Sequence, residues 1–254
     1  MRWCDHPMAS GTRYLRDMLG FELHMKQMRA QRGETIPAAW YMRPYFYPLR
    51  IELGKMRGSG ETIRFPAWVK KPDYEFELVG MCLEPIKTTC RKAAIDHMQH
   101  NMLFCIMNDC SCRDFQGEDL QLPLSISNSK GIADKSFGRI CLRGRDLNMD
   151  ENGVFRLGMY LTVNGMRRAE TSFDTIYFND PETGERRNWS FAEVITWFGR
   201  MNQGFEAGDL IGSGTVGNGS IAERGNIIPW LEAFDKIEMQ VDRLGTLTNL
   251  VAIQ

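Results

Sequence analysis

The sequence lacks the features that mark several special classes of protein. No apolar run approaches the roughly 18 residues of a membrane-spanning helix, and the longest uninterrupted one is only Met102–Met107. Neither sign of charge predominates, because 31 Lys and Arg residues oppose 32 Asp and Glu residues and leave a net charge of −1. This balance gives no overall attraction to nucleic acid or to an anionic membrane, so we expect neither as a partner.

The cysteines also lack the arrangement of a disulfide framework. There are 7, an odd number, and no two of them form a C-x-x-C pair. The N-terminal residues Met1–His6 do not show the basic, apolar and small-residue order of a secretory signal. These observations favour a reducing compartment, and we expect a cytoplasmic protein.

The length and composition are those of an ordinary globular protein. The 254 residues suffice for a sizeable core, and the hydrophobic and charged fractions are 43% and 25%. We expect residues 1–60 to form a helical and aromatic segment that packs over the functional site, and residues 61–254 to form the main domain within one structural unit. Helical spacing predicts a helix from Thr12 to Arg32, and the proline-containing stretch Ile36–Tyr47 is typical of an ordered loop or an edge segment.

Apolar patterning predicts strands in much of the remaining chain. Asp73–Leu83 alternates between apolar and polar residues, Met102–Met107 is a short apolar strand, and Lys236–Val241 alternates again. Val154–Val163 leads into Asn164-Gly165, which is a strong signal for a hairpin turn. Strands therefore account for most of the regular structure that we expect.

Two predicted helices interrupt the strands. One is Thr89–Asn101, and the other opens at Ser190, where Ser190 and Glu193 match a capping box. Many strands with few helices indicate a mainly β protein of the α+β class. We expect a mixed β-sandwich roll with a few peripheral helices, rather than a doubly wound α/β sheet.

Two glutamates in the first predicted strand are the most informative residues for function. Glu75 and Glu77 point to the same face with Cα atoms about 6.6 Å apart, so they repel each other unless a cation lies between them or the face is solvated. Asp109 adds a third carboxylate just after the strand that ends at Met107. Carboxylate oxygens are hard ligands suited to Mg²⁺, Mn²⁺ or Ca²⁺. A strand with one solvated face has the same alternation, and the pattern alone favours that interpretation.

Two other regions contain residues of chemical interest. Asp17 and His24 are seven positions apart, which places them on one face of the predicted helix. A structural ion pair and a buried, partnered imidazole are the alternative interpretations. Glycines are dense in Gly208–Thr215 and Gly217–Glu223, where backbone N–H groups can approach a carboxylate, although a tight surface turn is the alternative.

Short motifs that contain these residues resemble the fumarylacetoacetate hydrolase superfamily. Each motif alone is weak evidence, but all of them occur in the family's order over most of the chain. They are R-D-x-x-x-F-E-x-H (Arg16–His24), P-D-Y-E-F-E-L (Pro72–Leu78), N-D-x-S-x-R-D-x-Q (Asn108–Gln116), D-K-S-F-G (Asp134–Gly138), V-N-G (Val163–Gly165), G-D-L-I-G-S-G-T (Gly208–Thr215) and G-S-I-A-E (Gly219–Glu223). The resemblance implies the β-sandwich roll of that superfamily's catalytic domain.

The resemblance also implies a metal centre and a catalytic pair. His24 and Glu223 correspond to a His–Glu pair that activates water. The cofactor would be Mg²⁺ or Mn²⁺, with Ca²⁺ as a further candidate. The implied metal ligands are Glu75, Glu77 and Asp109, joined by Asp17 in the branch that hydrolyses fumarylacetoacetate.

The remaining implied roles concern the substrate. Lys135 corresponds to the family's pocket lysine, with Lys130 as a rival because the length of the intervening loop varies. The positions that match substrate contacts and their supports are Tyr47, Arg113, Gln116, Gly214 and Thr215. The sequence departs from the family's pattern at Cys112 and at Ile140–Arg143. Because the latter region shapes the pocket in relatives, the departure concerns the identity of the substrate rather than the metal.

The expected function is therefore that of a metal-dependent hydrolase. The resemblance implies cleavage of a C–C bond in a β-diketo or acylpyruvate-type acid, through a metal-stabilised enolate and an activated water. Without the attack by water, the same groups would serve a decarboxylase, isomerase or hydratase of a β-keto or unsaturated 2-keto acid. A non-catalytic metal- or ligand-binding protein is a further alternative. We expect a small keto acid as substrate and a homodimer as the assembly.

Overall fold

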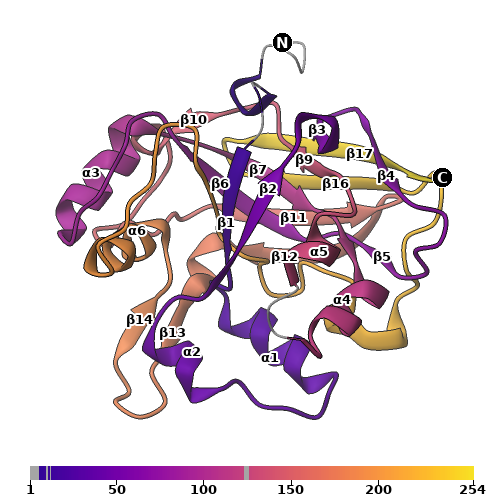
Figure 1. The fold of residues 1–254 in the computed structure, drawn as a ribbon, viewed down its shortest axis with the longest axis horizontal. Coiled ribbons are helices and arrows are strands. Elements are labelled where there is room, and N and C mark those ends of the chain that lie inside the picture. The colour runs from indigo at the N-terminus through magenta and orange to yellow at the C-terminus, as the bar shows by residue number, and fades with distance from the viewer. Residues whose placement is uncertain (1–5, 10, 12, 123–125) are drawn as a thin grey trace.

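The computed structural model describes residues 6–254 except 10, 12 and 123–125, and Figure 1 shows its fold. The larger of two main sheets has eight strands in the order β2-β1-β15-β6-β7-β9-β3, with β10 paired to β7. These strands are β1 (Arg13–Met18), β2 (Phe46–Ile51), β3 (Met56–Gly58), β6 (Phe76–Cys82), β7 (Met102–Asp109), β9 (Lys135–Phe137), β10 (Leu142–Arg143) and β15 (Leu210–Gly212).

The second main sheet has five strands in the order β12-β11-β16-β17-β4. They are β4 (Thr62–Phe65), β11 (Gly158–Val163), β12 (Met166–Ser172), β16 (Lys236–Val241) and β17 (Gly245–Ile253). Two small antiparallel pairs complete the strands, β5 (Pro72–Asp73) with β8 (Ser111–Cys112) and β13 (Tyr177–Asn179) with β14 (Arg186–Asn188). Both main sheets are mixed, because β1–β15, β3–β9 and β4–β17 are parallel pairs among antiparallel ones.

The helices are short and lie around the sheets. In Figure 1, α3 and α6 lie together at one end of the molecule, away from α1, α4 and α5. The α-helices are α1 (Glu22–Ala30), α2 (Ala38–Met42), α3 (Arg91–Asn101), α4 (Arg113–Asp119), α5 (Ile126–Lys130) and α6 (Phe191–Arg200), and the 3₁₀ turns are η2 (Pro7–Ala9), η3 (Leu53–Lys55), η4 (Gly144–Asp146), η5 (Phe173–Ile176) and η6 (Ala222–Ile227). Among the described residues, no helix has the length and apolar character needed to cross a membrane.

The main core lies between the two sheets. Alternate residues of a strand point to opposite faces, so Phe76 and Leu78 of β6 join this core together with Leu161 of β11. Val79 belongs to a smaller cluster on the other face of the larger sheet. Glu77 shares that second face with Val79 and is only 1% exposed, so the interpretation of a solvated face is wrong. The predicted mainly β roll with few peripheral helices is confirmed.

Strong local patterns are also confirmed in the structure. The predicted strands 102–107 and 236–241 are β7 and β16, and the helix predicted at 89–101 is α3. Asn164 and Gly165 join β11 to β12 with φ values of 53° and 75°, as a two-residue hairpin turn requires. The strand before this turn begins at Gly158 rather than at Val154.

The predicted helix from Thr12 to Arg32 is wrong over its first half. Thr12 lies outside the described residues, and Arg13–Met18 forms β1, which pairs in parallel with β15 and antiparallel with β2. Only Glu22–Ala30 is helical. The exposed fraction alternates along β1, from 62% at Tyr14 to 1% at Leu15, as pairing within a sheet demands. Asp17 and His24 therefore lie on different elements and not on one face of a helix.

Two further local predictions need correction. Ile36–Tyr47 contains α2 and the start of β2, although β2 is an edge strand as expected. Ser190 precedes α6 as predicted, but its hydroxyl makes no capping hydrogen bond and is buried without a partner. The capping box fails because Glu193 instead forms an ion pair with Arg91 of α3, at 2.5 Å.

The packing of α6 generates a test of the fold. A Cβ atom added at Gly199 would overlap the backbone carbonyl of Thr88, whereas one added at Gly117 of α4 meets nothing within 4 Å. We expect Gly199→Ala to lower the free energy of unfolding by about 1–3 kcal/mol through overpacking. Gly117→Ala should leave it equal or slightly higher, because alanine is the better helix former. Urea denaturation of both variants measures this, and equal stability of Gly199→Ala and the unchanged protein would contradict the packing.

Candidate metal centre and active site

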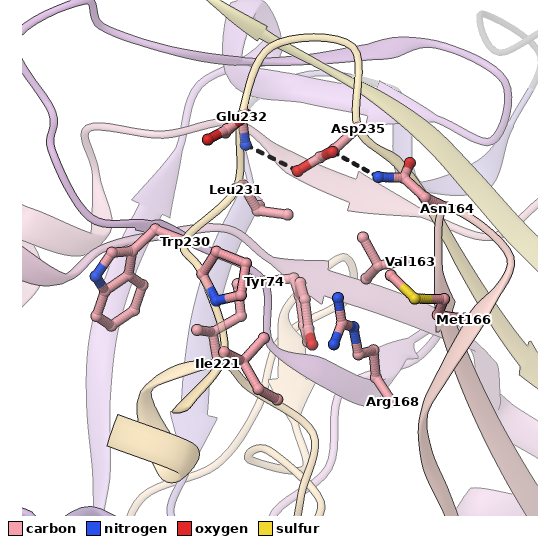
Figure 2. Close-up of a pocket in the computed structure, with 12 residues that line it drawn as sticks. Tyr74, Val163, Asn164, Met166, Arg168, Ile221, Trp230, Leu231, Glu232 and Asp235 are labelled. Atoms are coloured by element: carbon pink, nitrogen blue, oxygen red, sulfur yellow. Dashed lines mark hydrogen bonds between the residues drawn. The ribbon is translucent and has the colours of Figure 1, made fainter. Parts of the chain in front are cut away.

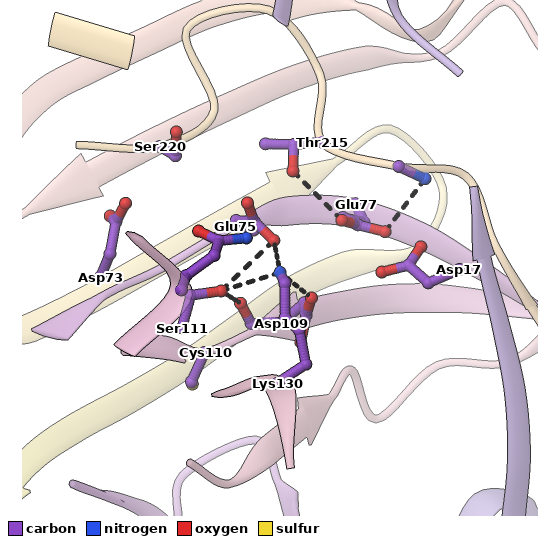
Figure 3. Close-up of polar contacts among 12 residues, drawn as sticks. Asp17, Asp73, Glu75, Glu77, Asp109, Cys110, Ser111, Lys130, Thr215 and Ser220 are labelled. Carbon is purple, nitrogen blue, oxygen red and sulfur yellow. Dashed lines mark hydrogen bonds and ion pairs between the residues drawn. The ribbon is translucent and has the colours of Figure 1, made fainter. Parts of the chain in front are cut away.

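Three carboxylates from different strands converge on the face of the larger sheet that is turned away from the main core. Oxygens of Asp17 (β1), Glu77 (β6) and Asp109 (end of β7) all lie within 4.8 Å of one another, and all three residues are buried (Figure 3). Strand register explains the convergence. Glu77 is opposite Met107, two residues before Asp109, and Asp17 is opposite Gly212, where an added Cβ would overlap the aspartate carboxylate.

The electrostatics of this trio favour a bound cation. Burial, followed by the negative charge of Asp109, raises the pKa of Asp17 to about 7. Burial and the charges of Asp17 and Asp109 hold the pKa of Glu77 well above its usual range. Oδ1 of Asp17 is buried and has no hydrogen-bond partner. An unsatisfied anionic oxygen among hard oxygen donors fits Mg²⁺ or Mn²⁺, because a divalent ion would offset the mutual repulsion.

Glu75, the fourth carboxylate of the expected ligand set, lies beside the trio and has other partners. Arg113 Nη2 donates to Glu75 Oε1 at 2.8 Å, and Lys130 Nζ contacts Glu75 Oε2. Burial alone would raise the pKa of Glu75, but the charges of Arg113 and Lys130 outweigh it and hold that pKa well below the usual range. The structure therefore groups Asp17, Glu77 and Asp109, and it places Glu75 in ion pairs.

Two lysines approach Asp109 from different sides. Nζ of Lys130 is 2.5 Å from Asp109 Oδ2 and 2.9 Å from Ser111 Oγ, whereas Nζ of Lys135 is 2.5 Å from Asp109 Oδ1 and 2.6 Å from the carbonyl of Cys110. Lys130 lines the same cavity as Asp17 and Glu77, and Lys135 does not. The geometry thus gives the position nearest the cavity to Lys130, which the sequence offered only as a rival to Lys135.

The expected histidine and glutamate meet although they are 199 positions apart. His24 Nδ1 (α1) is 2.8 Å from Glu223 Oε1 (η6), and the glutamate side chain is fully buried. Backbone N–H groups of Ser220 and Asn218 donate to Glu223 at 2.7 and 3.1 Å and fix its orientation. This pairing leaves Nε2 of His24 as the nitrogen that can exchange a proton in the cavity.

Four of the expected substrate residues line the same cavity of about 120 Å³, and Gly214 does not; the four are Tyr47, Arg113, Gln116 and Thr215. Tyr47 Oη lies 2.6 Å from Oδ2 of both Asp17 and Asp109. The hydroxyl of Thr215 donates to Glu77 Oε1 at 3.2 Å, and the N–H of Gly214 donates to Glu77 Oε2 at 3.1 Å. The apolar part of the wall includes Met18, Leu19, Met25, Met28, Leu120 and Ile126, and Arg29 and Arg32 also line the cavity.

A buried aspartate that the sequence analysis missed connects the two halves of the site. Asp73 accepts from Arg113 Nε at 2.7 Å and from the N–H groups of Ile221 and Ala222 at 2.8 and 3.1 Å. Arg113 in turn holds Gln116 Oε1 at 2.6 Å. The support expected of Arg113 therefore reaches the loop that carries Glu223. The Pro-Asp start of the second motif contained this residue, but nothing in its spacing indicated the partner.

Buried carboxylates beside a paired imidazole, within one cavity of a curled β fold, define the site of an enzyme with a position for a divalent cation. Comparison of the chain with known families gives this class its name. Residues 14–252 match the family model described as fumarylacetoacetate (FAA) hydrolase C-terminal, and the chain belongs to this family.

Individual relatives differ in their reactions. Oxaloacetate tautomerase YisK from Bacillus subtilis (strain 168) is 26% identical over 198 residues, which cover 76% of this chain and 57% of that protein. The chain thus spans little more than half the length of this curated relative. Fumarylpyruvate hydrolase from Pseudomonas aeruginosa, in complex with Mn²⁺ and pyruvate, gives a TM-score of 0.69 at 17% identity, over 96% of this chain and 90% of that one. The 2-hydroxyhepta-2,4-diene-1,7-dioate isomerase from Mycobacterium marinum gives 0.65 at 20% identity, over 98% and 77%.

The position of Lys130 generates a prediction about metal affinity. Its ammonium group neutralises Asp109 and Glu75, so a divalent cation must compete with it for these carboxylates. We expect Lys130→Met to bind Mn²⁺ more tightly by about tenfold or more, as measured by isothermal titration calorimetry. Lys236→Met, which removes a half-exposed lysine paired with Glu238, is the matched control and should leave the affinity unchanged. Unchanged or weaker binding by a folded Lys130→Met protein would contradict this assignment.

Proposed function

We propose that the protein is a divalent-metal-dependent hydrolase that cleaves a C–C bond in a β-diketo or acylpyruvate-type acid. The observation that carries this proposal is one cavity lined by Asp17, Glu77 and His24. The buried Asp109 completes the carboxylate trio beside it, and the buried Glu223 pairs with His24. The family includes hydrolases, isomerases and tautomerases. A paired imidazole beside the carboxylates is the feature that favours hydrolysis among them.

Asp17, Glu77 and Asp109 would hold the cation, with Mg²⁺ or Mn²⁺ preferred for these oxygen donors. When bound, the ion supplies a Lewis acid that polarises a substrate carbonyl and stabilises the negative charge that develops as the C–C bond breaks. The complex of the Pseudomonas aeruginosa enzyme with Mn²⁺ and pyruvate supports the choice of ion and of a keto acid.

The protein's own side chains would manage the protons and the charge of the substrate. Nε2 of His24 accepts a proton from water, while Glu223 fixes the ring and balances the positive charge that the ring acquires. The ammonium group of Lys130 is placed to stabilise an oxyanion at the cavity wall, a role for which Lys135 is less accessible. Arg29 and Arg32 line the cavity and share Glu34 as an ion-pair partner, which leaves one net positive charge there for a substrate carboxylate.

Keto–enol tautomerisation or decarboxylation of an oxaloacetate-like acid is the second candidate function. The observation in its favour is the similarity to the Bacillus subtilis oxaloacetate tautomerase. The same carboxylates and cation would serve this reaction, and no attack by water on the substrate is needed. The fate of water therefore separates the two candidates.

A substrate screen in H₂¹⁸O tests the choice directly. Acylpyruvates, oxaloacetate and unsaturated 2-keto acids are incubated with the protein and Mn²⁺, and the products are identified by mass. Hydrolysis yields two fragments, with ¹⁸O in the new carboxylate, and an excess of chelator abolishes it. Turnover that converts only oxaloacetate, with no newly formed carboxylate that carries ¹⁸O, would replace the first proposal with the second.

Removal of the His24 imidazole provides a second test of hydrolysis. We expect His24→Ala to lower kcat for hydrolysis by about 10²–10⁴, the usual range for loss of a general base. Its Mn²⁺ affinity should persist, because His24 lies outside the carboxylate trio. His100→Ala, which alters a half-exposed histidine on α3, serves as the control. Unchanged turnover of the preferred substrate by His24→Ala would exclude water activation by this pair.

We also propose that the protein forms a homodimer. Ile227 and Phe234 are each 87% exposed, and apolar side chains so accessible are favourable sites for burial between subunits. Light scattering at micromolar concentration should give twice the mass of the 29.2 kDa chain. A monomer mass would contradict the assembly without affecting the proposed chemistry.

A further inference from the structure

A second cavity, of about 210 Å³, lies beside the active site without sharing a lining residue with it. The end of the β11–β12 hairpin, the start of η6 and the loop before β16 enclose it (Figure 2). Tyr74 forms part of its wall. Because neighbouring residues of an extended segment point in opposite directions, Tyr74 faces this cavity while Glu75 faces the metal centre.

Arg168 brings a guanidinium group without an ion-pair partner among the described residues to this cavity. Its guanidinium group projects toward the hydroxyl of Tyr74 (Figure 2). Nε of Arg168 is buried and has no hydrogen-bond partner, and no carboxylate of a described residue forms an ion pair with it. The adjacent Arg167, in contrast, is half-exposed and pairs with Glu170 at 3.3 Å. A buried N–H donor such as this Nε is costly unless a ligand or water completes its hydrogen bond.

The acidic residues at the cavity do not supply that partner. Both oxygens of Asp235 are engaged, one by Asn164 Nδ2 at 2.7 Å and the other by the N–H of Glu232 at 2.8 Å. The side chain of Glu232 is exposed to solvent. Among the charged groups that line the cavity, Arg168 is therefore the one with a buried donor left open for an anionic occupant.

The rest of the wall is mainly apolar. Val163, Ile221 and Leu231 are buried, Met166 lies at the hairpin end, and the indole ring of Trp230 flanks the opening. A small apolar cavity with one convergent cationic group is suited to a compact ligand with one anionic end. A carboxylate matches the fork of donors on a guanidinium group.

We propose that this cavity is a binding site for a small organic carboxylate, which pairs with Arg168 and packs its apolar or unsaturated body against Trp230 and Ile221. The site is separate from the active site, but the two are in contact through the chain. Ile221 and Ala222 donate to Asp73, and Glu223 follows directly in the same turn. An occupant that presses on Ile221 therefore touches the segment that orients Glu223 against His24.

Benzoate, with the uncharged benzamide as its comparison, tests the site by calorimetric titration of the whole protein. We expect saturable binding of benzoate that is weakened at least about tenfold by Arg168→Met. Arg167→Met, its neighbour on β12, should bind as the unchanged protein does. Met166→Glu, which adds a repelling carboxylate at the hairpin end, should also abolish binding while the protein keeps its unfolding temperature.

Three results would overturn the proposal. The first is an absence of saturable benzoate binding at millimolar concentration. The second is equal affinity for benzoate in folded Arg168→Met and in the unchanged protein, which would place the ligand elsewhere, for example in the active site. The third is binding of benzamide as tight as that of benzoate. A change in the ¹H–¹³C NMR signal of His24 on addition of benzoate, lost in Arg168→Met, would support the contact with the catalytic segment.

Discussion

The mutual repulsion of three buried carboxylates is the constraint on which the rest of the site depends. Asp17, Glu77 and Asp109 cannot all remain ionised at this separation without nearby positive charge. The chain supplies that charge on one side only, because Lys130 and Lys135 both reach Asp109. Among the described residues no lysine or arginine forms an ion pair with Asp17 or Glu77. The site is therefore asymmetric, and its deficit of positive charge lies toward β1 and β6.

A second charged network, centred on Asp73, links the carboxylates of the metal site to the loop that carries Glu223. Asp73 is fully buried, and all its contacts are with Arg113 or with backbone N–H groups, including those that precede Glu223. Arg113 also holds Glu75. Removing any one of these groups would leave a buried charge without its partner, which is far costlier than replacing an exposed ion pair. Buried ion pairs and hydrogen bonds therefore join the metal side of the site to the imidazole side.

Sequence patterns predicted the parts of the fold that depend on local periodicity. β7, β16 and the Asn164-Gly165 turn follow from a run of apolar residues, from alternation and from backbone stereochemistry. β1 could not be predicted in this way, because its residues also fit helical spacing and only pairing with β15 and β2 makes them a strand. The same limit applies to the site. The motifs named the carboxylates, but the position of Lys130 depends on how α5 packs against β2 and β8, which no spacing in the sequence encodes.

The pairing of β1 with β15 has a consequence for the order of events during synthesis. His24 leaves the ribosome 199 residues before Glu223, which at about 5–20 residues per second is a delay on the order of 10–40 s. For nearly all of that time the edge of β1 that pairs with β15 is open, and an open strand edge is a template for association with other chains. Arg13, Arg16 and Asp17 place charge on half of the six residues of β1. Because charge on an open strand edge disfavours association, Asp17 would serve the nascent strand as well as the site of the folded protein.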